Sequence, residues 1–317
     1  MSSSRRLRTR HRGRVLIVEF DNPPRHFYDE QTSIELEALT RAVQRDRTVG
    51  AVLFTGRGSS YLTHFDVPTM VRAARTTRFR VGYPWAVMTV SAGRLAVRSQ
   101  LANRVLASTP ARDLMVLART YAALDRLNRS DKVIVTAING MALGMGCVFA
   151  LACDIRLTAD DIELGLPESA LAVLAAGGGT QRLIRAVGTS RALDMLLDGR
   201  RLTAAQAHEL GLVHYVVPGD ELRRYGFAVA DRLARRSSVV NREIKRAVYR
   251  AGTRPLPAAL RSEAAGLVTT LTSRQALRSL DAYHRHLSSQ DELTDDAVIG
   301  GWIPLLEDGV PPEDRSR

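Results

Sequence analysis

Short apolar runs alternate with helical patterns through the first half of the chain. Val15–Phe20 is an apolar run of strand length, and apolar residues from Ile34 to Val43 recur at the spacing of one helical face. The expected strands are Arg14–Phe20, Gly50–Thr55, about Lys132–Ile138 and Asp154–Thr158, with helices over about 32–46 and from the turn near 144 to about 152. Strands that alternate with helices indicate an α/β fold with buried sheets.

The pattern becomes mainly helical from Thr180 onward. Thr203 and Gln206 form a capping box before a helix that ends at Gly211. Ser190 is the expected cap of a helix over Arg191–Leu197, which Gly199 ends. Further helices are expected near 221–236, 239–249, 256–270 and 274–286. Residues 288–317 hold eight acidic residues and two arginines, which predicts an acidic tail that is flexible or lies on the surface.

The charge pattern changes this picture at two places. The net charge is +12, yet residues 1–14 alone carry six arginines and no acid, and residues 67–112 carry eight arginines and no acid. Such patches bind nucleic acid, anionic lipid, acidic proteins or cofactor phosphates, or are simply solvated surface. We do not expect nucleic acid binding, because no readout motif accompanies the charge. The predicted divisions are a basic tail at 1–13, a core at 14–218 with an insertion at about 68–112, a helical region at 219–287 and the acidic tail at 288–317.

The two cysteines and the longest uncharged segment bear on the compartment. Cys147 and Cys153 lie in one apolar segment, which suits reduced thiols in a core and a cytoplasmic location. The uncharged stretch Val133–Cys153 is long enough to cross a bilayer as a helix. Glycines at 140, 144 and 146 divide it, however, so it predicts a strand, a turn and a helix, and no membrane span.

The first candidate for chemistry is the glycine-rich turn Asn139-Gly-Met-Ala-Leu-Gly-Met-Gly-Cys147. A strand that runs into such a turn and then a helix exposes backbone N–H groups at a helix N-terminus, where they stabilise an anion or a developing oxyanion. The alternative is tight packing of the helix on the sheet. The turn alone therefore does not define a function.

The second candidate is the carboxylate of Glu168. It follows Pro167 in Gly165-Leu-Pro-Glu168 and is surrounded in sequence by apolar residues up to Gly179. Apolar surroundings disfavour the charged form, which suits a group that takes and returns a proton. The alternative is a solvated glutamate at a helix start.

Taken together, these segments resemble the crotonase superfamily, the enoyl-CoA hydratase/isomerase family. The resemblance is carried by Ala142-Leu-Gly-Met-Gly-Cys147, Leu151-Ala-Cys-Asp-Ile155, Gly165-Leu-Pro-Glu168, Gly177-Gly-Gly-Thr-Gln-Arg-Leu183 and the capping-box region up to Val213. It implies an α/β crotonase-like spiral of ββα units with a helical C-terminal trimerisation region, assembled as a homotrimer or a dimer of trimers. It also implies an acyl-CoA substrate and no separate cofactor or metal ion, because CoA is part of the substrate.

The resemblance assigns roles to individual positions. Two backbone N–H groups, those of Phe65 and Met145, would hold the thioester oxygen as an enolate forms. Each such donor is worth about 3–4 kcal/mol in a hydrolase oxyanion hole. The substrate-binding positions that the family pattern implies are Arg25, His26, Phe27, Thr63, His64 and Gly144. Asp154 and the cysteines would be structural.

Position 148 departs from the family's hydratases, which place a second glutamate there. Here it is Val148, so Glu168 is the one carboxylate left of the pair. Loss of a cooperating acid/base group removes about 100- to 10,000-fold of rate. A lone base suffices to move a double bond, so we predict a Δ3/Δ2-enoyl-CoA isomerase-like enzyme. The alternatives are a hydratase, decarboxylase or hydrolase, or a catalytically weak scaffold.

His64 and the insertion are further departures. His64 stands beside a predicted oxyanion donor as either a structural histidine, which we favour, or an additional acid or base. The insertion has apolar patches at Val81–Val90 and Leu101–Leu106 that could wall the acyl pocket. Its arginines could meet CoA phosphates or an acidic protein partner, and a subunit-contact arm is the alternative.

Overall fold

The computed structural model describes residues 5–76, 81–97, 99 and 112–309 of the chain. A six-stranded sheet forms its centre, in the order β1-β2-β3-β4-β6-β9. All neighbours in this sheet are parallel except the β1–β2 pair. The strands are β1 (Leu7–Arg12), β2 (Val15–Phe20), β3 (Ala51–Gly56), β4 (Val133–Ile138), β6 (Ile155–Ala159) and β9 (Tyr215–Val217).

The N-terminal segment corrects one prediction. Residues 7–12, expected to belong to a basic tail, form β1 and pair antiparallel with β2. Gly13, with a positive φ of 56°, makes the tight connection between them. Five of the six β1 residues are exposed, so this edge strand carries its arginines on the surface while β2 is buried. The strand was missed because its sequence is basic and polar, and an edge strand need not be apolar.

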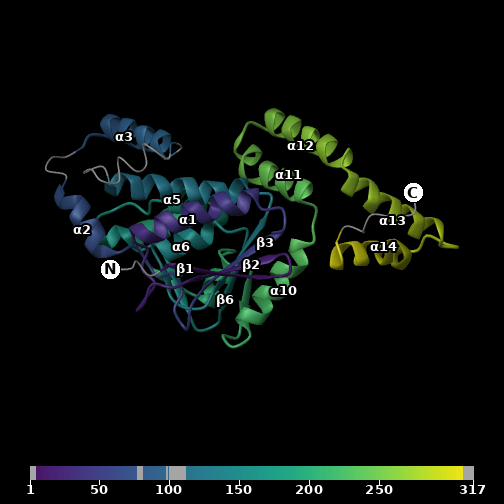
Figure 1. The fold of residues 1–317 in the computed structure, drawn as a ribbon, viewed down its shortest axis with the longest axis horizontal. Helices are drawn as coiled ribbons and strands as arrows, with labels where there is room; N and C mark the ends of the chain where they lie inside the picture. The colour runs from purple at the N-terminus through teal and green to yellow at the C-terminus, as the bar shows by residue number, and fades with distance from the viewer. Residues whose placement is uncertain (1–4, 77–80, 98, 100–111, 310–317) are drawn as a thin grey trace.

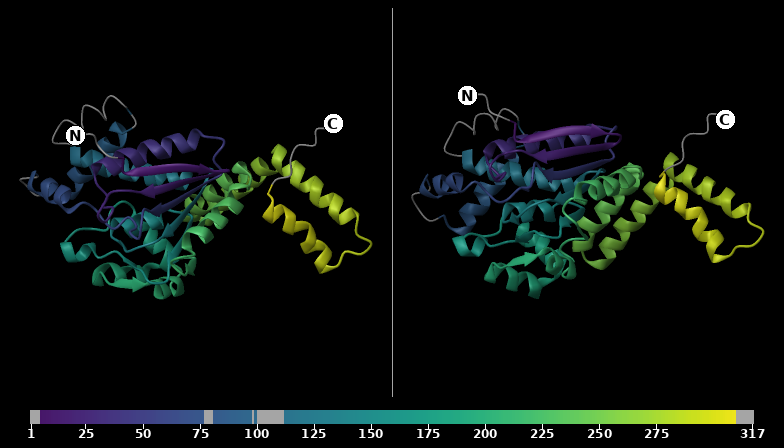
Figure 2. Two further views of the ribbon diagram at one scale, coloured as in Figure 1. Left: turned by 60° about the horizontal axis from the view of Figure 1, so that its bottom comes forward. Right: turned by 90° about the horizontal axis from the view of Figure 1, so that it is seen from below.

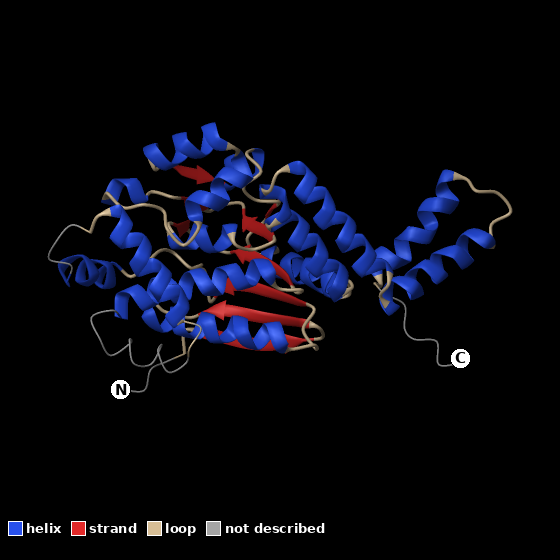
Figure 3. Ribbon diagram, turned by 90° about the horizontal axis from the view of Figure 1, so that it is seen from above, coloured by secondary structure: helices blue, strands red, loops and turns tan. Residues whose placement is uncertain are grey.

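Helices cover the sheet (Figures 1 and 3). α1 (Glu30–Arg45) packs against α5 (Arg112–Arg129), and α10 (Leu222–Ala234) packs on β2, β3, β4 and β6. Val52, Leu53 and Phe54 of β3 are buried, as expected for a central parallel strand. The predicted strands and the predicted helices near 32–46 and 221–236 are therefore confirmed within a few residues.

A second, three-stranded sheet positions the glycine turn beside Glu168. β5 (Ala142–Leu143) pairs parallel with β7 (Glu163–Gly165), which pairs antiparallel with β8 (Arg201–Thr203). α6 (Met145–Leu151) begins directly after β5, and a 3₁₀ turn, η1 (Glu168–Leu171), follows β7. The pairing of β5 with β7 thus brings together two segments that are about twenty residues apart in sequence.

The middle helices agree with the expected caps, with one exception. The capping box of Thr203 and Gln206 opens α9 (Ala204–Glu209), as predicted. α7 (Gly179–Val187) precedes α8 (Thr189–Asp198), whose N-cap is Gly188 and not Ser190. Ser190 was the wrong cap because the helix begins at Thr189, two residues before the predicted start.

Asp154 ties the following helices to the core, which agrees with its expected structural role. Its carboxylate accepts hydrogen bonds from the Ile134 backbone N–H (2.8 Å), the Lys245 ammonium (2.7 Å) and the Tyr249 hydroxyl (2.8 Å). Lys245 and Tyr249 belong to α11 (Ser238–Tyr249). This buried cluster fixes α11 against β4.

The C-terminal helices extend away from the body of the molecule (Figures 1 and 2). They are α12 (Leu256–Leu271), α13 (Arg274–Ser288) and α14 (Asp295–Glu307), joined to α11 through the 3₁₀ turn η2 (Ala251–Thr253). No residue of α12 or α13 is buried. Within the predicted acidic tail, residues 295–307 form α14, which packs on α13, with the Tyr283 and Trp302 rings 5.0 Å apart. An apolar helix lies among the acidic residues.

The expected insertion contains two helices in its described part. α2 (Val67–Thr76) leads away from the Phe65 loop, and α3 (Tyr83–Ala96) packs on α5, where Gly93 lies against Leu114 and Ala118. Tyr83 and Trp85 are 82% and 66% exposed, so the Val81–Val90 patch is surface. The second patch, Leu101–Leu106, lies outside the described residues.

Candidate active site

An apolar cavity of about 560 Å³ opens between α2, α5, the glycine turn and the segment after Pro167. The residues that line it are His64, Phe65, Val67, Thr69, Met70, Ala73, Asp113, Val116, Leu117, Leu143, Gly144, Met145, Pro167, Glu168, Ala170, Leu171, Val173, Leu174 and Ala176. Most are apolar, and the lining includes two carboxylates, Glu168 and Asp113. A pocket of this size and lining suits an acyl chain.

Phe65 lines the cavity, and its backbone N–H is not used by the contact between its loop and Tyr28. Tyr28 and Phe65 form an isolated parallel bridge, in which Tyr28 N donates to His64 O (2.8 Å) and Asp66 N donates to Tyr28 O (3.1 Å). In a parallel bridge these bonds involve the neighbours of Phe65, so its own N–H points away from Tyr28. Within the described chain no group accepts a hydrogen bond from this N–H.

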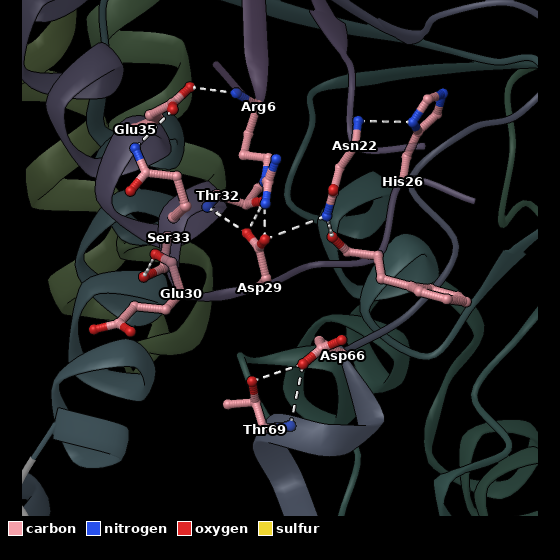
Figure 4. Close-up of polar contacts among 12 residues, drawn as sticks. Arg6, Asn22, His26, Asp29, Glu30, Thr32, Ser33, Glu35, Asp66 and Thr69 are labelled. Atoms are coloured by element: carbon pink, nitrogen blue, oxygen red, sulfur yellow. Dashed lines mark hydrogen bonds and ion pairs between the residues drawn. The ribbon is translucent and has the colours of Figure 1, made fainter. Parts of the chain in front are cut away.

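Asp66 braces the same loop. Its carboxylate accepts hydrogen bonds from Thr69 N (3.1 Å) and Thr69 Oγ1 (2.7 Å) and so caps the start of α2 (Figure 4). The cap couples the direction of the α2 helix, which forms one cavity wall, to the position of Phe65.

Met145 is the first residue of α6, and its N–H has no acceptor inside the helix. The N–H groups on both sides are bonded, because Gly144 N donates to Gly165 O (2.9 Å) and Gly146 N donates to Thr63 O (3.2 Å). A Cβ atom on Gly146 would lie 1.9 Å from the Leu62 carbonyl oxygen. Glycine at 146 thus lets the helix start press against the Phe65 loop, and both predicted oxyanion donors border one cavity.

Glu168 lies directly beside the glycine turn. One carboxylate oxygen, Oε1, is 3.1 Å from the point that a Cβ atom on Gly144 would occupy. The other, Oε2, is buried and has no hydrogen-bond partner in the described structure. Burial raises the pKa of this carboxyl above its ordinary value of 4.5. A carboxylate with a raised pKa and a free oxygen is equipped to exchange a proton with a bound molecule.

Val148 is buried in the core and does not line the cavity. Its methyl groups lie 3.0 Å and 2.7 Å from the points that Cβ atoms on Gly177 and Gly179 would occupy. The glycine run therefore makes room for this side chain. Position 148 supplies packing in this chain and no proton-transfer group.

His64 lines the cavity with one ring nitrogen engaged. The ring stacks on Phe27 with centroids 4.7 Å apart, and Nδ1 lies 2.6 Å from the Phe65 carbonyl oxygen. A carbonyl oxygen only accepts, so Nδ1 carries the proton and Nε2 of the neutral ring is an acceptor. The Nδ1 hydrogen bond agrees with the structural role that we favoured for His64, and Nε2 is left for a ligand.

Gly144, another predicted substrate-binding position, lines the cavity, whereas Arg25, His26, Phe27 and Thr63 do not. His26 is buried with a positive φ of 52°, and its ring accepts from Asn22 N (2.9 Å) and donates to Arg57 O (2.9 Å), as Figure 4 shows for Asn22. Thr63 Oγ1 donates to Arg25 O (2.6 Å). The side chains of His26 and Thr63 thus hold the loop that carries Phe27 and His64.

The sequence interpretation missed most of the cavity wall. Met70 and Ala73 come from α2, and Asp113, Val116 and Leu117 come from α5, a helix that was not predicted. The spacing of residues 113, 116 and 117 is that of one helical face and could have revealed it. The patch at 81–90, for which a place in the wall and a subunit-contact arm were the alternatives, does not line the cavity, and α2 forms that wall.

The fold and this site define the chain as an acyl-CoA enzyme of the crotonase fold. The model of the enoyl-CoA hydratase/isomerase family matches residues 102–290, and the chain belongs to that family. The described part contains no helix long and apolar enough to cross a membrane.

Relatives and a solved structure agree with this assignment. A 2,3-dehydroadipyl-CoA hydratase of Escherichia coli is 41% identical over 44% of this chain, a match that spans only 54% of that relative. A probable mitochondrial enoyl-CoA hydratase of Dictyostelium discoideum is 29% identical over 76% of this chain and 74% of its own. An enoyl-CoA hydratase structure from Geobacillus kaustophilus superposes with a TM-score of 0.72 at 26% identity, covering 90% of this chain and 95% of that one.

Proposed function

We propose that this enzyme moves the double bond of an enoyl-CoA thioester from the 3- to the 2-position. Glu168 is the acid/base, and the N–H groups of Phe65 and Met145 hold the thioester oxygen. One observation about two positions carries the proposal. Glu168 Oε2 is buried without a hydrogen-bond partner in the described structure, whereas position 148 is an apolar valine outside the cavity. One carboxylate is sufficient for isomerisation, whereas hydration by two carboxylates requires a second one at position 148.

The proposed reaction transfers one proton out and back. Glu168 takes a proton from C2, the C2–H electron pair becomes the C1–C2 double bond of a dienolate that keeps its C3–C4 double bond, and the negative charge moves to the thioester oxygen. The backbone donors stabilise that charge in a site of low dielectric. Protonated Glu168 returns the proton to C4, which restores the thioester carbonyl and leaves a C2–C3 double bond. No atom is gained or lost.

Hydration is the second candidate, because His64 lines the cavity with Nε2 available as an acceptor. In that reaction Nε2 would take a proton from water as the oxygen attacks C3, and Glu168 would protonate C2. The two relatives and the structure described above are named hydratases, which supports this alternative.

An assay with paired 3-enoyl- and 2-enoyl-CoA thioesters separates the two. Double-bond migration is followed by absorbance, and addition of water by a mass increase. Migration without hydration supports the isomerase, hydration supports the His64 mechanism, and binding without either reaction would contradict both.

Replacement of Glu168 tests the mechanism directly. We expect Glu168→Gln to lower turnover at least about 100-fold, because the amide cannot accept the proton, while thioester binding persists. Glu163→Gln is the control, since Glu163 pairs with Arg201 on the surface. Near-normal turnover of the Glu168 variant would remove this residue from the mechanism.

We further propose a homotrimer or a dimer of trimers in the cytoplasm. Exposed apolar residues on the projecting helices α12–α14 support assembly, and two buried free thiols support a reducing compartment. The arginines of α2 remain candidates for CoA phosphates or an acidic partner.

A further inference from the structure

A second carboxylate in the same cavity has one oxygen without a hydrogen-bond partner in the described structure. Asp113 Oδ1 is buried and unpartnered, as Glu168 Oε2 is, and both residues line the one cavity. The chemistry proposed above uses Glu168 and gives Asp113 no task. A buried carboxylate oxygen without a donor costs free energy, so its retention in an apolar wall points to a ligand group.

The position of Asp113 on α5 separates it from the reacting centre. Thr120 on the same helix is near the start of α6. A Cβ atom on Gly177 would lie 3.9 Å from the Thr120 methyl group and 3.9 Å from Met145 Sδ. Asp113 is seven residues earlier in α5, two turns or about 10 Å along the helix axis. Val116 and Leu117 occupy the intervening wall. A thioester held at Met145 would therefore extend its chain along apolar residues toward Asp113.

An ion pair with Arg72 does not satisfy this carboxylate oxygen. Arg72 Nη2 is 3.7 Å from Asp113 Oδ1, too far for a hydrogen bond, and its side chain is 52% exposed and outside the cavity lining. Ion pairs with exposed arginines contribute little. The ion pair places a negative and a positive charge side by side, and Asp113 Oδ1 can still accept a hydrogen bond.

We propose that Asp113 is a specificity-determining residue that accepts a hydrogen bond from a hydroxyl group at the distal end of the acyl chain. Asp113 would repel a distal carboxylate, and Arg72 would repel an ammonium group. A neutral donor meets neither penalty. The inference rests on the proposed acyl-CoA function and adds a substrate class to it, enoyl-CoA thioesters with a hydroxylated chain end.

The test compares matched thioesters that differ only in a terminal hydroxyl, over a series of chain lengths. For the length that reaches Asp113, we expect the wild-type enzyme to prefer the hydroxylated thioester by about 10- to 100-fold in kcat/KM, the effect of a hydrogen bond to a charged group. Asp113→Leu should remove or reverse that preference, mainly by raising kcat/KM for the unsubstituted chain. Asp113→Asn, which keeps the shape, should reduce it.

Asp125→Asn is the matched control, because Asp125 lies on the same helix and pairs with Arg129 at the surface. It should keep the wild-type preference. Equal kcat/KM for both thioesters at every length in the wild type, or a uniform loss of both in Asp113→Leu, would overturn the inference while leaving the proposed function intact. Absence of turnover with either thioester would count against the proposed function. In that case the affinities of the two thioesters, measured by calorimetry, still test the role of Asp113.

Discussion

Glu168 and Val148 decide at the residue scale which proton chemistry the cavity supports. Glu168 keeps a carboxylate oxygen buried beside Gly144, whereas Val148 fills space next to Gly177 and Gly179. A glutamate at position 148 would have to displace that packing before its carboxylate reached the cavity. The difference between the two positions is therefore built into the surrounding backbone as well as into the side chains.

The raised pKa of Glu168 predicts the pH dependence of turnover. As a base Glu168 must be ionised, so we expect kcat/KM to rise with pH along a limb whose midpoint lies above 4.5, because burial disfavours the charged form. Measurement of kcat/KM from pH 4 to 9 checks this. A midpoint below 4.5 would contradict the assigned role.

The same pKa shift predicts an effect on stability. Folding raises the pKa of Glu168, so the folded state binds more protons than the unfolded state between the two pKa values, and the free energy of unfolding falls as pH rises through this window. Glu168→Gln removes that loss. We expect the free energy of unfolding of the variant, measured by denaturant unfolding, to match that of the wild type near pH 4 and to exceed it at pH 7. If the difference in the free energy of unfolding between variant and wild type were the same at pH 4 and pH 7, burial would not disfavour the charged carboxylate.

At the scale of elements, the junction of β5 with α6 is the most constrained part of the site. Gly144 has a φ of 53°, and Gly146 leaves no room for a Cβ atom against the backbone of Leu62 and Thr63. The junction holds the Met145 N–H beside the loop of Phe65. Both oxyanion donors thus depend on one close contact between two backbones.

Gly146→Ala tests this contact. A Cβ atom 1.9 Å from the Leu62 carbonyl oxygen forces the two backbones apart, so we expect a loss of turnover of about 100-fold or more and a loss of stability above about 2 kcal/mol. Gly252→Ala is the control, because its nearest neighbour, Ala247 O, lies at an ordinary 3.6 Å. Enoyl-CoA kinetics and thermal unfolding provide the readouts, and wild-type turnover in Gly146→Ala would contradict a rigid junction.

Helices α5 and α3 show why element prediction from the sequence was incomplete. In α5 the polar residues Arg119 and Asn128 are buried, and Arg126 lies 3.2 Å from Glu37 of α1. In α3 the apolar residues Tyr83 and Trp85 are exposed. Periodicity assumes the reverse arrangement, so it fails where polar groups are paired inside and apolar groups lie outside.

At the scale of the whole molecule, the projecting C-terminal helices expose an extended apolar surface. The exposed large apolar residues of this region are Leu256, Leu260, Leu267, Val268, Leu271, Leu277, Leu280, Val298, Ile299, Trp302, Ile303 and Leu306. Such a surface on helices that bury so little of it within their own chain favours a second subunit.

We therefore expect Leu267→Glu combined with Leu271→Glu to reduce the assembly to smaller species, because burying two charges in an apolar interface is costly. Light scattering coupled to size-exclusion chromatography measures the mass. Glu263→Gln on the same helix is the control and should leave the mass unchanged. A monomeric wild-type protein would contradict the proposed assembly.

The sequence by itself determined the α/β class, the central strands, most helices after Thr180 and the family, because these depend on local periodicity, caps and short motifs around Gly144 and Glu168. It also singled out Phe65, Met145 and His64, which the fold gathers at one cavity. Tertiary structure alone decided that a basic segment forms β1, that α14 packs on α13, and that Asp113 shares a cavity with Glu168. Those outcomes depend on contacts between segments far apart in the chain. A local sequence pattern does not indicate which buried polar groups form hydrogen bonds in the folded protein.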